Sequence, residues 1–352
     1  MKKVLIVGSN SIHCQRFING LLAEQNYSLA IITNKRMPEF TAIETLEVNF
    51  VLRNLSAAKQ IRKFIQQLTP DIIHIHQANS YAWHTLRAIE KLSNKPKVIL
   101  TTWGSDVLLL PHKNKLMLKM VRYNLQHANV ITADSLFMTA KISQLLDGIN
   151  RPIHTINFGI QNIPEISSIN QKQKLIISNR LHKPLYRIDA IIKAFAYLSN
   201  HGLIDDDYKL LVAASGEQHS QLEQLSHDLG VNQRIIFSGM ISYQELVSYY
   251  AKASVFVSVP ESDGTASSLL EAMVYGCIPV LSNLPANLEW VLDQVNGFIA
   301  PDMSQLQSQL LAAIELSQNV IEYNKLINFN HQLISKKANS NHNTKAFCEL
   351  YE

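Results

Sequence analysis

The sequence contains few cysteines and no long hydrophobic run, and each absence excludes a class of protein. Its three cysteines, Cys14, Cys277 and Cys348, are widely separated and odd in number, so they argue against a disulfide framework and have no metal-ligand spacing. A reducing cytosol fits this composition. No window approaches the roughly eighteen apolar residues of a membrane-spanning helix. The apolar part of the opening segment MKKVLIVGSN is too short for a signal peptide.

A strong charge of either sign is also missing. The chain is 17% charged, with a net charge of +4 and a pI near 8.8, which does not by itself indicate nucleic acid. No basic–aromatic RNA motif or recognition-helix pattern is present. At 47% hydrophobic residues the chain can bury cores, and its 352 residues favour two domains over one.

Short apolar strands alternate with helical patterns in both halves, which predicts parallel, doubly wound sheets. In the first half we expect strands at 4–7, 29–33, 72–75, 97–101 and 130–132, with helices at 57–68 and 81–92. The polar stretch 161–173 has no clear period and is interpreted as the linker. In the second half we expect strands at 175–178, 209–213, 234–237, 255–259 and 278–281, and a final strand after a turn at 296–298. Helices are expected at 188–198, 220–229 and 243–250.

The most informative stretch is 256–285, FVSVPESDGTASSLLEAMVYGCIPVLSNLP. It predicts a strand, a polar loop at 261–264, a helix and a second strand, which form one βαβ unit. In open parallel sheets ligands bind at the carboxyl ends of the strands, where this loop lies. Asp263 in the loop and Glu271 in the helix are the two acids of the unit. They could also be only a loop acid and an exposed helix acid.

Between these two acids the residues are small, so a ligand can approach the backbone. The first amides of the helix point unpaired at the loop and carry the positive end of the helix dipole, which suits a phosphate. The residues of this predicted phosphate site are Gly264, Thr265, Ala266, Ser267 and Ser268.

The run SDGTASSLLEAMVYGCIPV, with NGFIAP after it, resembles the nucleotide-sugar site of glycosyltransferase family 4, retaining enzymes of the GT-B fold. That family shows Glu, seven residues, Glu, then Ala-Met, Gly and Pro-Val. This chain has Asp263 at the first acidic position and keeps Glu271, Ala272, Met273, Gly276, Pro279 and Val280. The similarity runs in order from about residue 4 to about residue 313.

The resemblance implies an α/β chain with two doubly wound Rossmann-like domains and an interdomain cleft. It implies an acceptor-side domain at 1–164 and a nucleotide-sugar-binding domain at 165–320. A helix and tail at 321–352 are expected to cross back to the first domain.

The resemblance also assigns the donor contacts. Arg180 stands where the family has an arginine on the donor diphosphate, and guanidinium forks fit phosphate oxygens. The family's second cation, a lysine, aligns with Tyr186, so either Arg187 or Lys183 is expected to replace it. The alternative for Arg180 is a surface arginine at a strand end. Turns at Gly216 and Met240 are expected to face the base through backbone groups.

In this reading Asp263 holds the sugar hydroxyls, Glu271 holds the ribose, and Arg180 and Arg187 stabilise the leaving phosphate. No metal is needed if these groups act together. The family does not fix the base, so the donor is expected to be linked to UDP or GDP, with no further cofactor.

The acceptor side is expected in the first half of the chain. Ser11 and His13 follow the first strand, and His76 lies at a strand end from which it could reach the cleft. Because His74 and His76 share one strand face without an evident third ligand, a metal site is the less favoured interpretation. Trp103 stands where the family segment His-Gly-Ser-Asp has its histidine, and it could stack on a sugar ring.

The segment PHKNKLMLKMVRYNLQH at 111–127 has no acidic residue. Its cations are Lys113, Lys115, Lys119 and Arg122, beside apolar residues at helical spacing. A basic amphipathic helix can lie on an anionic bilayer. The alternative is an ordinary solvated face over a core stripe. We expect a cytoplasmic protein with peripheral contact to the inner face of the plasma membrane.

The sequence therefore predicts a retaining, metal-independent glycosyltransferase. It would move a sugar from a nucleotide-sugar donor to a glycan or lipid-linked acceptor, in synthesis of a bacterial surface polysaccharide such as capsule or lipopolysaccharide. The alternatives are a nucleotide-sugar-binding protein without transfer activity, and a sugar-nucleotide epimerase or phosphorylase of the same fold.

Overall fold

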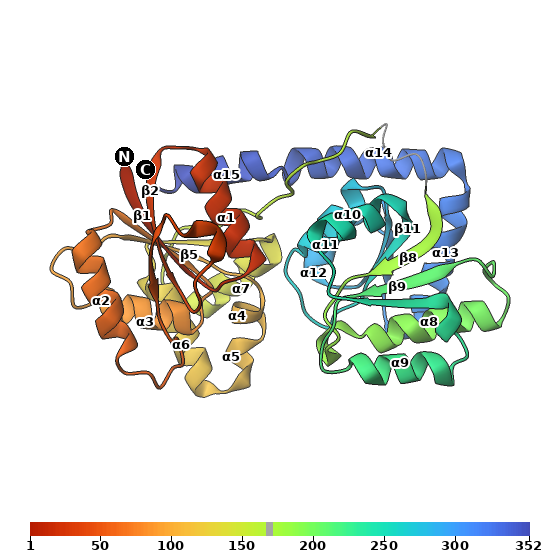
Figure 1. Ribbon diagram of the computed structural model, residues 1–352, viewed down its shortest axis with the longest axis horizontal. Coiled ribbons are helices and arrows are strands. Elements are labelled where there is room, and N and C mark those ends of the chain that lie inside the picture. The colour runs from red at the N-terminus through yellow and green to blue at the C-terminus, as the bar shows by residue number, and fades with distance from the viewer. Residues whose placement is uncertain (167–171) are drawn as a thin grey trace. The chain divides into compact units, whose positions relative to one another are not determined.

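The computed structural model describes residues 1–166 and 172–352 and divides the chain into two units (Figure 1). The first unit comprises residues 1–158 and 340–352, and the second comprises residues 159–339. The first division lies before the predicted boundary at 164, because Ile160 already pairs with Asn339 and is buried in a core of the second unit. Within the linker predicted at 161–173, residues 167–171 lie outside the described residues.

The first unit contains a seven-stranded parallel sheet with the order β3-β2-β1-β4-β5-β6-β7. Its strands are β1 (Lys2–Gly8), β2 (Tyr27–Thr33), β3 (Glu44–Glu47), β4 (Ile72–His76), β5 (Lys97–Thr101), β6 (Val130–Ala133) and β7 (Ile153–Thr155). Its helices are α1 (Ile12–Ala23), η1 (Pro38–Phe40), α2 (Ala57–Leu68), α3 (Ser80–Ile89), α4 (Ser105–Leu108), α5 (Leu110–Lys113), α6 (Lys115–His127), α7 (Leu136–Leu146) and α15 (Ser340–Glu349).

The second unit contains a six-stranded parallel sheet with the order β10-β9-β8-β11-β12-β13. Its strands are β8 (Gln173–Ser178), β9 (Lys209–Ala213), β10 (Ile235–Gly239), β11 (Ala253–Ser258), β12 (Ile278–Ser282) and β13 (Phe298–Ala300). Its helices are η3 (Pro184–Tyr186), α8 (Ile188–Asn200), α9 (His219–Asp228), η4 (Asn232–Arg234), α10 (Tyr243–Lys252), α11 (Ser267–Val274), α12 (Pro285–Leu288), η5 (Met303–Gln305), α13 (Leu306–Gln318) and α14 (Val320–Lys337).

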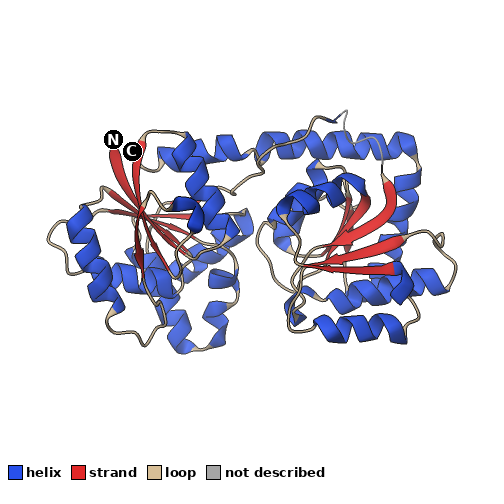
Figure 2. Cartoon of the chain, viewed as in Figure 1, coloured by secondary structure: helices blue, strands red, loops and turns tan. Residues whose placement is uncertain are grey.

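Helices cover both faces of each sheet, as Figure 2 shows, so each unit has two apolar cores. In the first unit one core lies under α2, α3, α6 and α7, and the other lies under α1 and the carboxyl-terminal residues. In the second unit the cores lie under α8 and α13 on one face and under α10 and α11 on the other. The central strands are buried on both faces, which explains their continuous apolar runs. The predicted α/β, doubly wound class is confirmed.

The order of each sheet reverses at one point, between β1 and β4 in the first unit and between β8 and β11 in the second. At such a reversal the connections on the two sides run to opposite faces of the sheet, and ligands bind outside the carboxyl ends of the two strands. The loops that follow these four strands are therefore the places to look for a site.

Two edge strands were missing from the prediction. The segment Glu44–Glu47 of β3 is half polar and the three residues of β7 are partly exposed, so neither has the apolar run of a central strand. The basic segment at 111–127 also differs from one continuous helix. Asn114 ends α5 and caps α6, because its side-chain oxygen accepts a hydrogen bond from the Met117 amide at 2.9 Å.

Candidate functional site

In the second unit the loops after β8 and β11 meet at the reversal of the sheet order. We call residues 179–183 and 261–266 the charged loops. Arg180 lies in the first loop, and its Nη2 is 2.6 Å from Asp263 Oδ2 in the second. Its Nη1 donates to Ser268 Oγ at 3.1 Å, at the start of α11. The structure thus brings together three of the predicted donor-site residues from two segments that are far apart in sequence.

The aromatic ring of Tyr186 supports the same guanidinium. The Arg180 Cζ lies 4.5 Å from the ring centroid, a distance at which a cation is attracted to the ring face. The family's lysine position is therefore occupied here by a ring that stacks on the arginine. The side chains of Arg180 and Asp263 are only 12% and 21% exposed.

The second charged loop is held by its own backbone and by a residue that the sequence analysis missed. Asp263 Oδ1 accepts the Gly264 amide at 3.0 Å, which turns the loop. Trp290 is buried, and its indole Nε1 donates to Thr265 Oγ1 at 3.2 Å. A tryptophan 25 positions along the chain gave no signal of this contact in the sequence.

The start of α11 lies next to this loop. Ala266 is the residue before the helix, and it has no side chain that could cap it. The first amides, those of Ser267 and Ser268, therefore have no capping partner from that position, and they carry the positive end of the helix dipole. The arrangement can receive an anion between these amides and Arg180.

Glu271 lies one turn further along α11, and its side chain is buried, with 4% exposed. Burial and then the charge of Glu271 raise the pKa of Tyr250 well above its usual value, while Arg180 acts in the opposite direction. Glu271 and Arg180 therefore both lie within electrostatic reach of Tyr250. The exposed helix acid considered as an alternative is wrong for Glu271, because only 4% of this residue is exposed.

Arg187 is held by two backbone carbonyls that directly follow β11. Its Nε donates to the Val259 carbonyl at 2.8 Å and its Nη2 donates to the Pro260 carbonyl at 2.7 Å. Its backbone has a φ of 49°, which places it at the left-handed turn that starts α8. The guanidinium thus braces the end of β11 through two of its nitrogens, and its contact with a leaving phosphate stays a prediction. Lys183 is exposed, and no contact within the described residues holds its ammonium group.

Gly216 allows the loop after β9 to pack on the first charged loop. A Cβ at this position would lie 2.5 Å from the His182 carbonyl oxygen. Two backbone bonds join the loops, from the His182 amide to the Ser215 carbonyl at 3.1 Å and from the Gln218 amide to the His182 carbonyl at 3.0 Å. Met240 follows the bulge in β10 and is 73% exposed. The backbone of both predicted turns thus lies at the carboxyl edge of this sheet.

Buried polar atoms gather at the same edge. His182 is fully buried, and its Nδ1 lies 2.9 Å from His219 Nδ1. Among the described residues, neither the Nε2 of His182 nor the Oγ of Ser178 has a hydrogen-bond partner. Since buried polar groups are almost always paired, these two atoms add to the polar character of the edge. The sequence analysis named neither residue, because a single His or Ser carries no motif.

In the first unit three of the four predicted acceptor-side residues come together. Trp103 Nε1 donates to His76 Nδ1 at 3.3 Å, and the ring of His13 lies 5.6 Å from that of Trp103. Phe158 packs against all three rings. We call His13, His76, Trp103 and Phe158 the aromatic cluster. Ser11 instead caps α1, with its hydroxyl accepting the Cys14 amide at 3.4 Å.

His76 is fully buried, and burial lowers its pKa to about 3. Because its Nδ1 accepts from the indole, the neutral ring carries its proton on Nε2, an atom without a partner among the described residues. The expectation that His76 reaches a ligand is corrected: it orients Trp103. Trp103 and His13 are only partly buried. Phe158 is partly buried as well, so these three rings are the accessible part of the cluster.

His74 stacks on His76 at 4.8 Å and belongs to a buried polar chain. Its Nδ1 lies 2.7 Å from the Tyr351 hydroxyl and its Nε2 lies 2.6 Å from Thr101 Oγ1. Thr101 Oγ1 in turn lies 2.7 Å from Thr132 Oγ1. Both imidazoles therefore have structural partners. Across residues 1–166 and 172–352, no group of three or more His, Cys, Asp or Glu side chains could hold a metal ion.

The basic segment presents three exposed lysines, Lys113, Lys115 and Lys119, and the side chain of Leu116 is 68% exposed. Arg122 differs from them, because its Nη1 lies 3.3 Å from Asp147 Oδ2. The acid that opposes it lies outside the segment, on the turn after α7. None of the helices in the described part of the chain is long and apolar enough to cross a membrane.

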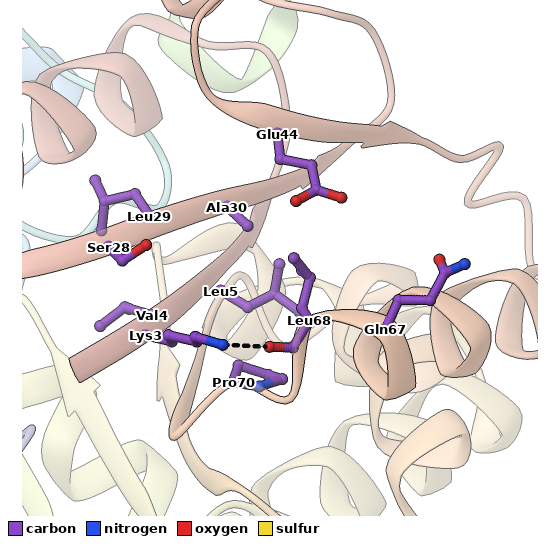
Figure 3. Close-up of a pocket in the computed structure, with 10 residues that line it drawn as sticks. All are labelled: Lys3, Val4, Leu5, Ser28, Leu29, Ala30, Glu44, Gln67, Leu68 and Pro70. Atoms are coloured by element: carbon purple, nitrogen blue, oxygen red, sulfur yellow. Dashed lines mark hydrogen bonds between the residues drawn. The ribbon is translucent and has the colours of Figure 1, made fainter. Parts of the chain in front are cut away.

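A pocket of about 270 Å³ lies elsewhere in the first unit (Figure 3). It is lined by Lys3 and Val4 of β1, Ser28 and Leu29 of β2, and the turn at Leu68 that precedes β4. In Figure 3 the Lys3 ammonium reaches the Leu68 carbonyl, a bond of 3.3 Å. These residues lie at the amino ends of the strands, the edge opposite to the predicted site. The pocket is therefore separate from the aromatic cluster.

Each half of the chain matches the model of a known protein family. Residues 3–135 match the family model described as glycosyl transferase 4-like, and residues 159–332 match the model described as glycosyl transferases group 1. The chain is 23% identical over 277 residues to N-acetyl-alpha-D-glucosaminyl L-malate synthase of Bacillus anthracis, covering 72% of this chain and 71% of the relative. It is 25% identical over 166 residues to alpha-monoglucosyldiacylglycerol synthase of Streptococcus pneumoniae, covering 46% and 37%.

Solved structures agree on the fold. Anabaena Alr3699/HepE in complex with UDP-glucose superposes with a TM-score of 0.80 at 14% identity, covering 99% of each chain. The sucrose-phosphate synthase of Thermosynechococcus elongatus superposes with a TM-score of 0.79 at 14% identity, covering 100% of this chain and 98% of the other. The two matched family models and the two parallel sheets agree with one another. The chain belongs to the GT4-type glycosyltransferases and has their GT-B fold.

Proposed function

We propose that this protein is a retaining glycosyltransferase that uses a nucleoside-diphosphate sugar, linked to UDP or GDP, as donor. The single observation that carries the donor site is the convergence of Arg180, Asp263 and the start of α11, at the reversal of the second sheet. Solved neighbours were crystallised in complex with UDP or UDP-glucose, which supports the same ligand class for this chain.

In this proposal the donor's diphosphate binds between the Arg180 guanidinium and the first amides of α11. Glu271 accepts hydrogen bonds from the ribose hydroxyls, and Asp263 accepts them from the sugar. The exposed ammonium of Lys183 supplies the second cation. The backbone at Gly216 and Met240 faces the base.

The reaction breaks the bond between the anomeric carbon and the phosphate oxygen. The acceptor hydroxyl forms its new bond on the same face of the sugar, and its proton passes to the leaving phosphate oxygen. Negative charge develops on that oxygen, and Arg180 and the helix amides are already in place to stabilise it. Prearranged donors of this kind need no reorganisation during the step, so the chain supplies electrostatic stabilisation rather than a general base.

On the acceptor side we propose that Trp103 and His13 provide ring surfaces for a glycan or lipid-linked acceptor. Aromatic faces suit the C–H surfaces of a sugar, and the indole is oriented by His76. The two curated relatives carry names of a malate glycoside synthase and a glucosyldiacylglycerol synthase, so acceptors differ widely among similar chains. Synthesis of a surface polysaccharide such as capsule or lipopolysaccharide remains our proposal for the pathway.

A transfer assay tests the proposal. The protein is incubated with radiolabelled UDP- and GDP-sugars and with a panel of oligosaccharide and lipid-linked acceptors. Transfer with retained anomeric configuration supports it. Tight donor binding without turnover would identify a nucleotide-sugar-binding protein, and an isomerised free donor would identify an epimerase. Arg180→Ala is expected to abolish transfer, while Lys193→Ala, on an exposed ion pair of α8, serves as the matched control.

We also propose that the exposed lysines of α5 and α6 contact an anionic membrane from the cytoplasmic side. Lys115 and Lys119 flank the exposed Leu116, which is the pairing of charge and apolar surface that suits a bilayer interface. Lys115→Glu with Lys119→Glu should lower binding to vesicles that contain phosphatidylglycerol at least about thirtyfold, since each lysine near such a surface contributes on the order of 1 kcal/mol. Unchanged vesicle binding would remove this part of the proposal.

A further inference from the structure

The guanidinium that the proposed donor site needs is already engaged by the chain itself. Its Nη2 lies 2.6 Å from Asp263 Oδ2, and its Nη1 donates to Ser268 Oγ. Its face rests on the Tyr186 ring. The strongest acceptor among these partners is the Asp263 carboxylate, since hydrogen bonds between two charged groups are about twice as strong as neutral ones.

A phosphate and a carboxylate present the same kind of oxygen to an arginine fork. Both cannot accept from the same N–H group of Arg180. Asp263 holds its position through the Gly264 amide, so the loop presents its carboxylate to the arginine without a ligand. With side chains 12% and 21% exposed, the pair is also less screened by solvent than a surface ion pair.

We propose that Asp263 is an internal competitor for Arg180. In the empty site its carboxylate neutralises the guanidinium, and a ligand binds by supplying a phosphate that replaces this carboxylate on Nη2. The displaced carboxylate then becomes available to hydroxyl groups of the transferred sugar. This inference rests on the proposed function and deepens it, because it makes the diphosphate the part of the donor that the site selects.

The competition has a consequence for ligand choice. A nucleoside without phosphates cannot displace Asp263 and gains nothing from its removal. A nucleoside diphosphate must displace it, so its measured affinity includes the loss of the ion pair. The same residue therefore lowers affinity for the spent nucleotide and raises the rate of transfer.

A different role for Asp263 would give the opposite result. If the carboxylate only orients Arg180 in advance for the phosphate, its removal leaves the guanidinium mobile and weakens nucleotide binding. The sign of the change in affinity for the nucleoside diphosphate therefore separates competition from orientation.

Isothermal titration calorimetry of the full-length protein provides the test, with UDP, GDP, uridine and guanosine as ligands. Asp263→Asn keeps the shape and removes the charge, and Asp263→Ser is a second variant should the first fail to fold. Asp189→Asn, which removes an exposed carboxylate on α8, is the matched control. Unfolding temperatures of the free proteins check the fold.

We expect Asp263→Asn to bind the preferred nucleoside diphosphate about three- to tenfold more tightly, in the range of one partly exposed ion pair. Affinity for the nucleoside should not change, and sugar transfer should fall. Weaker or equal diphosphate binding by both Asp263 variants would overturn the inference while the proposed function stands. A wild-type protein that binds neither UDP nor GDP would overturn the proposed function and the inference together.

Discussion

The charged loops of the second unit and the aromatic cluster of the first lie at the same point of two sheets with the same strand order, yet they differ in chemistry. The charged loops place an arginine and an aspartate beside the start of a helix. The aromatic cluster places rings around a histidine that burial keeps neutral. In our proposal one fold thus supplies an anion site in one unit and a neutral ring surface in the other, so charge and shape can be tested separately.

The largest expected effect is at Glu271, which in our proposal holds the ribose. Glu271→Ala should reduce affinity for the nucleoside diphosphate about 100-fold, because it removes two hydrogen bonds to a charged group at roughly 1.5 kcal/mol each. Calorimetry measures the change. The aromatic cluster should keep its acceptor affinity in the same variant. Glu271→Gln should bind the nucleoside diphosphate with an affinity between those of wild type and Glu271→Ala. Unchanged affinity for both UDP and GDP would remove Glu271 from the site.

The next effect concerns pH and the first unit. The pKa of His76 is lowered to about 3 by burial, against about 6.5 in an unfolded chain. Between these values the unfolded chain binds a proton that the folded chain does not, so stability is full above about pH 6.5 and falls as the pH decreases. From pH 7 to pH 5 the free energy of unfolding should fall by about 2 kcal/mol through His76 alone. The pKa of His74 is lowered in the same direction by burial and by His76.

Urea unfolding of wild type, His76→Phe and His112→Phe at both pH values measures this effect. His112 is exposed, so its variant should keep the wild-type dependence. The His76 variant should lose less stability on acidification. An equal loss in all three proteins would contradict a buried neutral imidazole at position 76.

A smaller effect separates the two regions in the assay of transfer. Trp103→Ala should raise the KM for the acceptor about tenfold and leave the Kd of the donor nucleotide unchanged, since a stacked ring contributes up to about 1.5 kcal/mol. Trp103→Phe should restore part of the loss by keeping a ring. If the donor Kd rises instead, Trp103 belongs to the donor side and the comparison between the regions breaks down.

The smallest effect is at Trp290, which supports the second charged loop through Thr265. Trp290→Phe keeps the packing and removes one hydrogen bond of about 1 kcal/mol, so the affinity for the nucleoside diphosphate should fall about fivefold. Thr265→Val removes the same bond from the other end and should give a similar loss. A double variant that loses no more than either single variant would confirm that the two residues act through one contact.

The fold class could be predicted from the sequence because central parallel strands are apolar on both faces, and their apolar runs are visible without a structure. It failed at β3 and β7, where edge position removes that pattern. It placed Arg180 and Asp263 in the donor site through the family resemblance. Their mutual ion pair could not be predicted from the sequence, because it joins loops 83 residues apart.

Other parts of the site were hidden for similar reasons. Arg187 was expected to contact phosphate because it flanks the position where the family has a lysine. Its two backbone acceptors lie 72 and 73 residues further along the chain, directly after β11, so no sequence pattern indicated them. The role of His76 in holding the Trp103 indole depends on strand order, which brings the ends of β4 and β5 together. Geometry of this kind decides whether a polar residue binds a ligand or supports its neighbour.

The hydroxyl of Tyr351 reaches into the interior of the first unit and meets His74, a partner 277 positions earlier. Lys2 on the opening strand also bonds to the Tyr351 carbonyl at 2.8 Å. The domain that leaves the ribosome first therefore cannot complete its core until residue 351 has been made. During synthesis the residues of the second unit are all made before residue 351, so the second unit can fold before the core of the first unit is complete. A tag fused after residue 352 would lie next to the residues that complete that core.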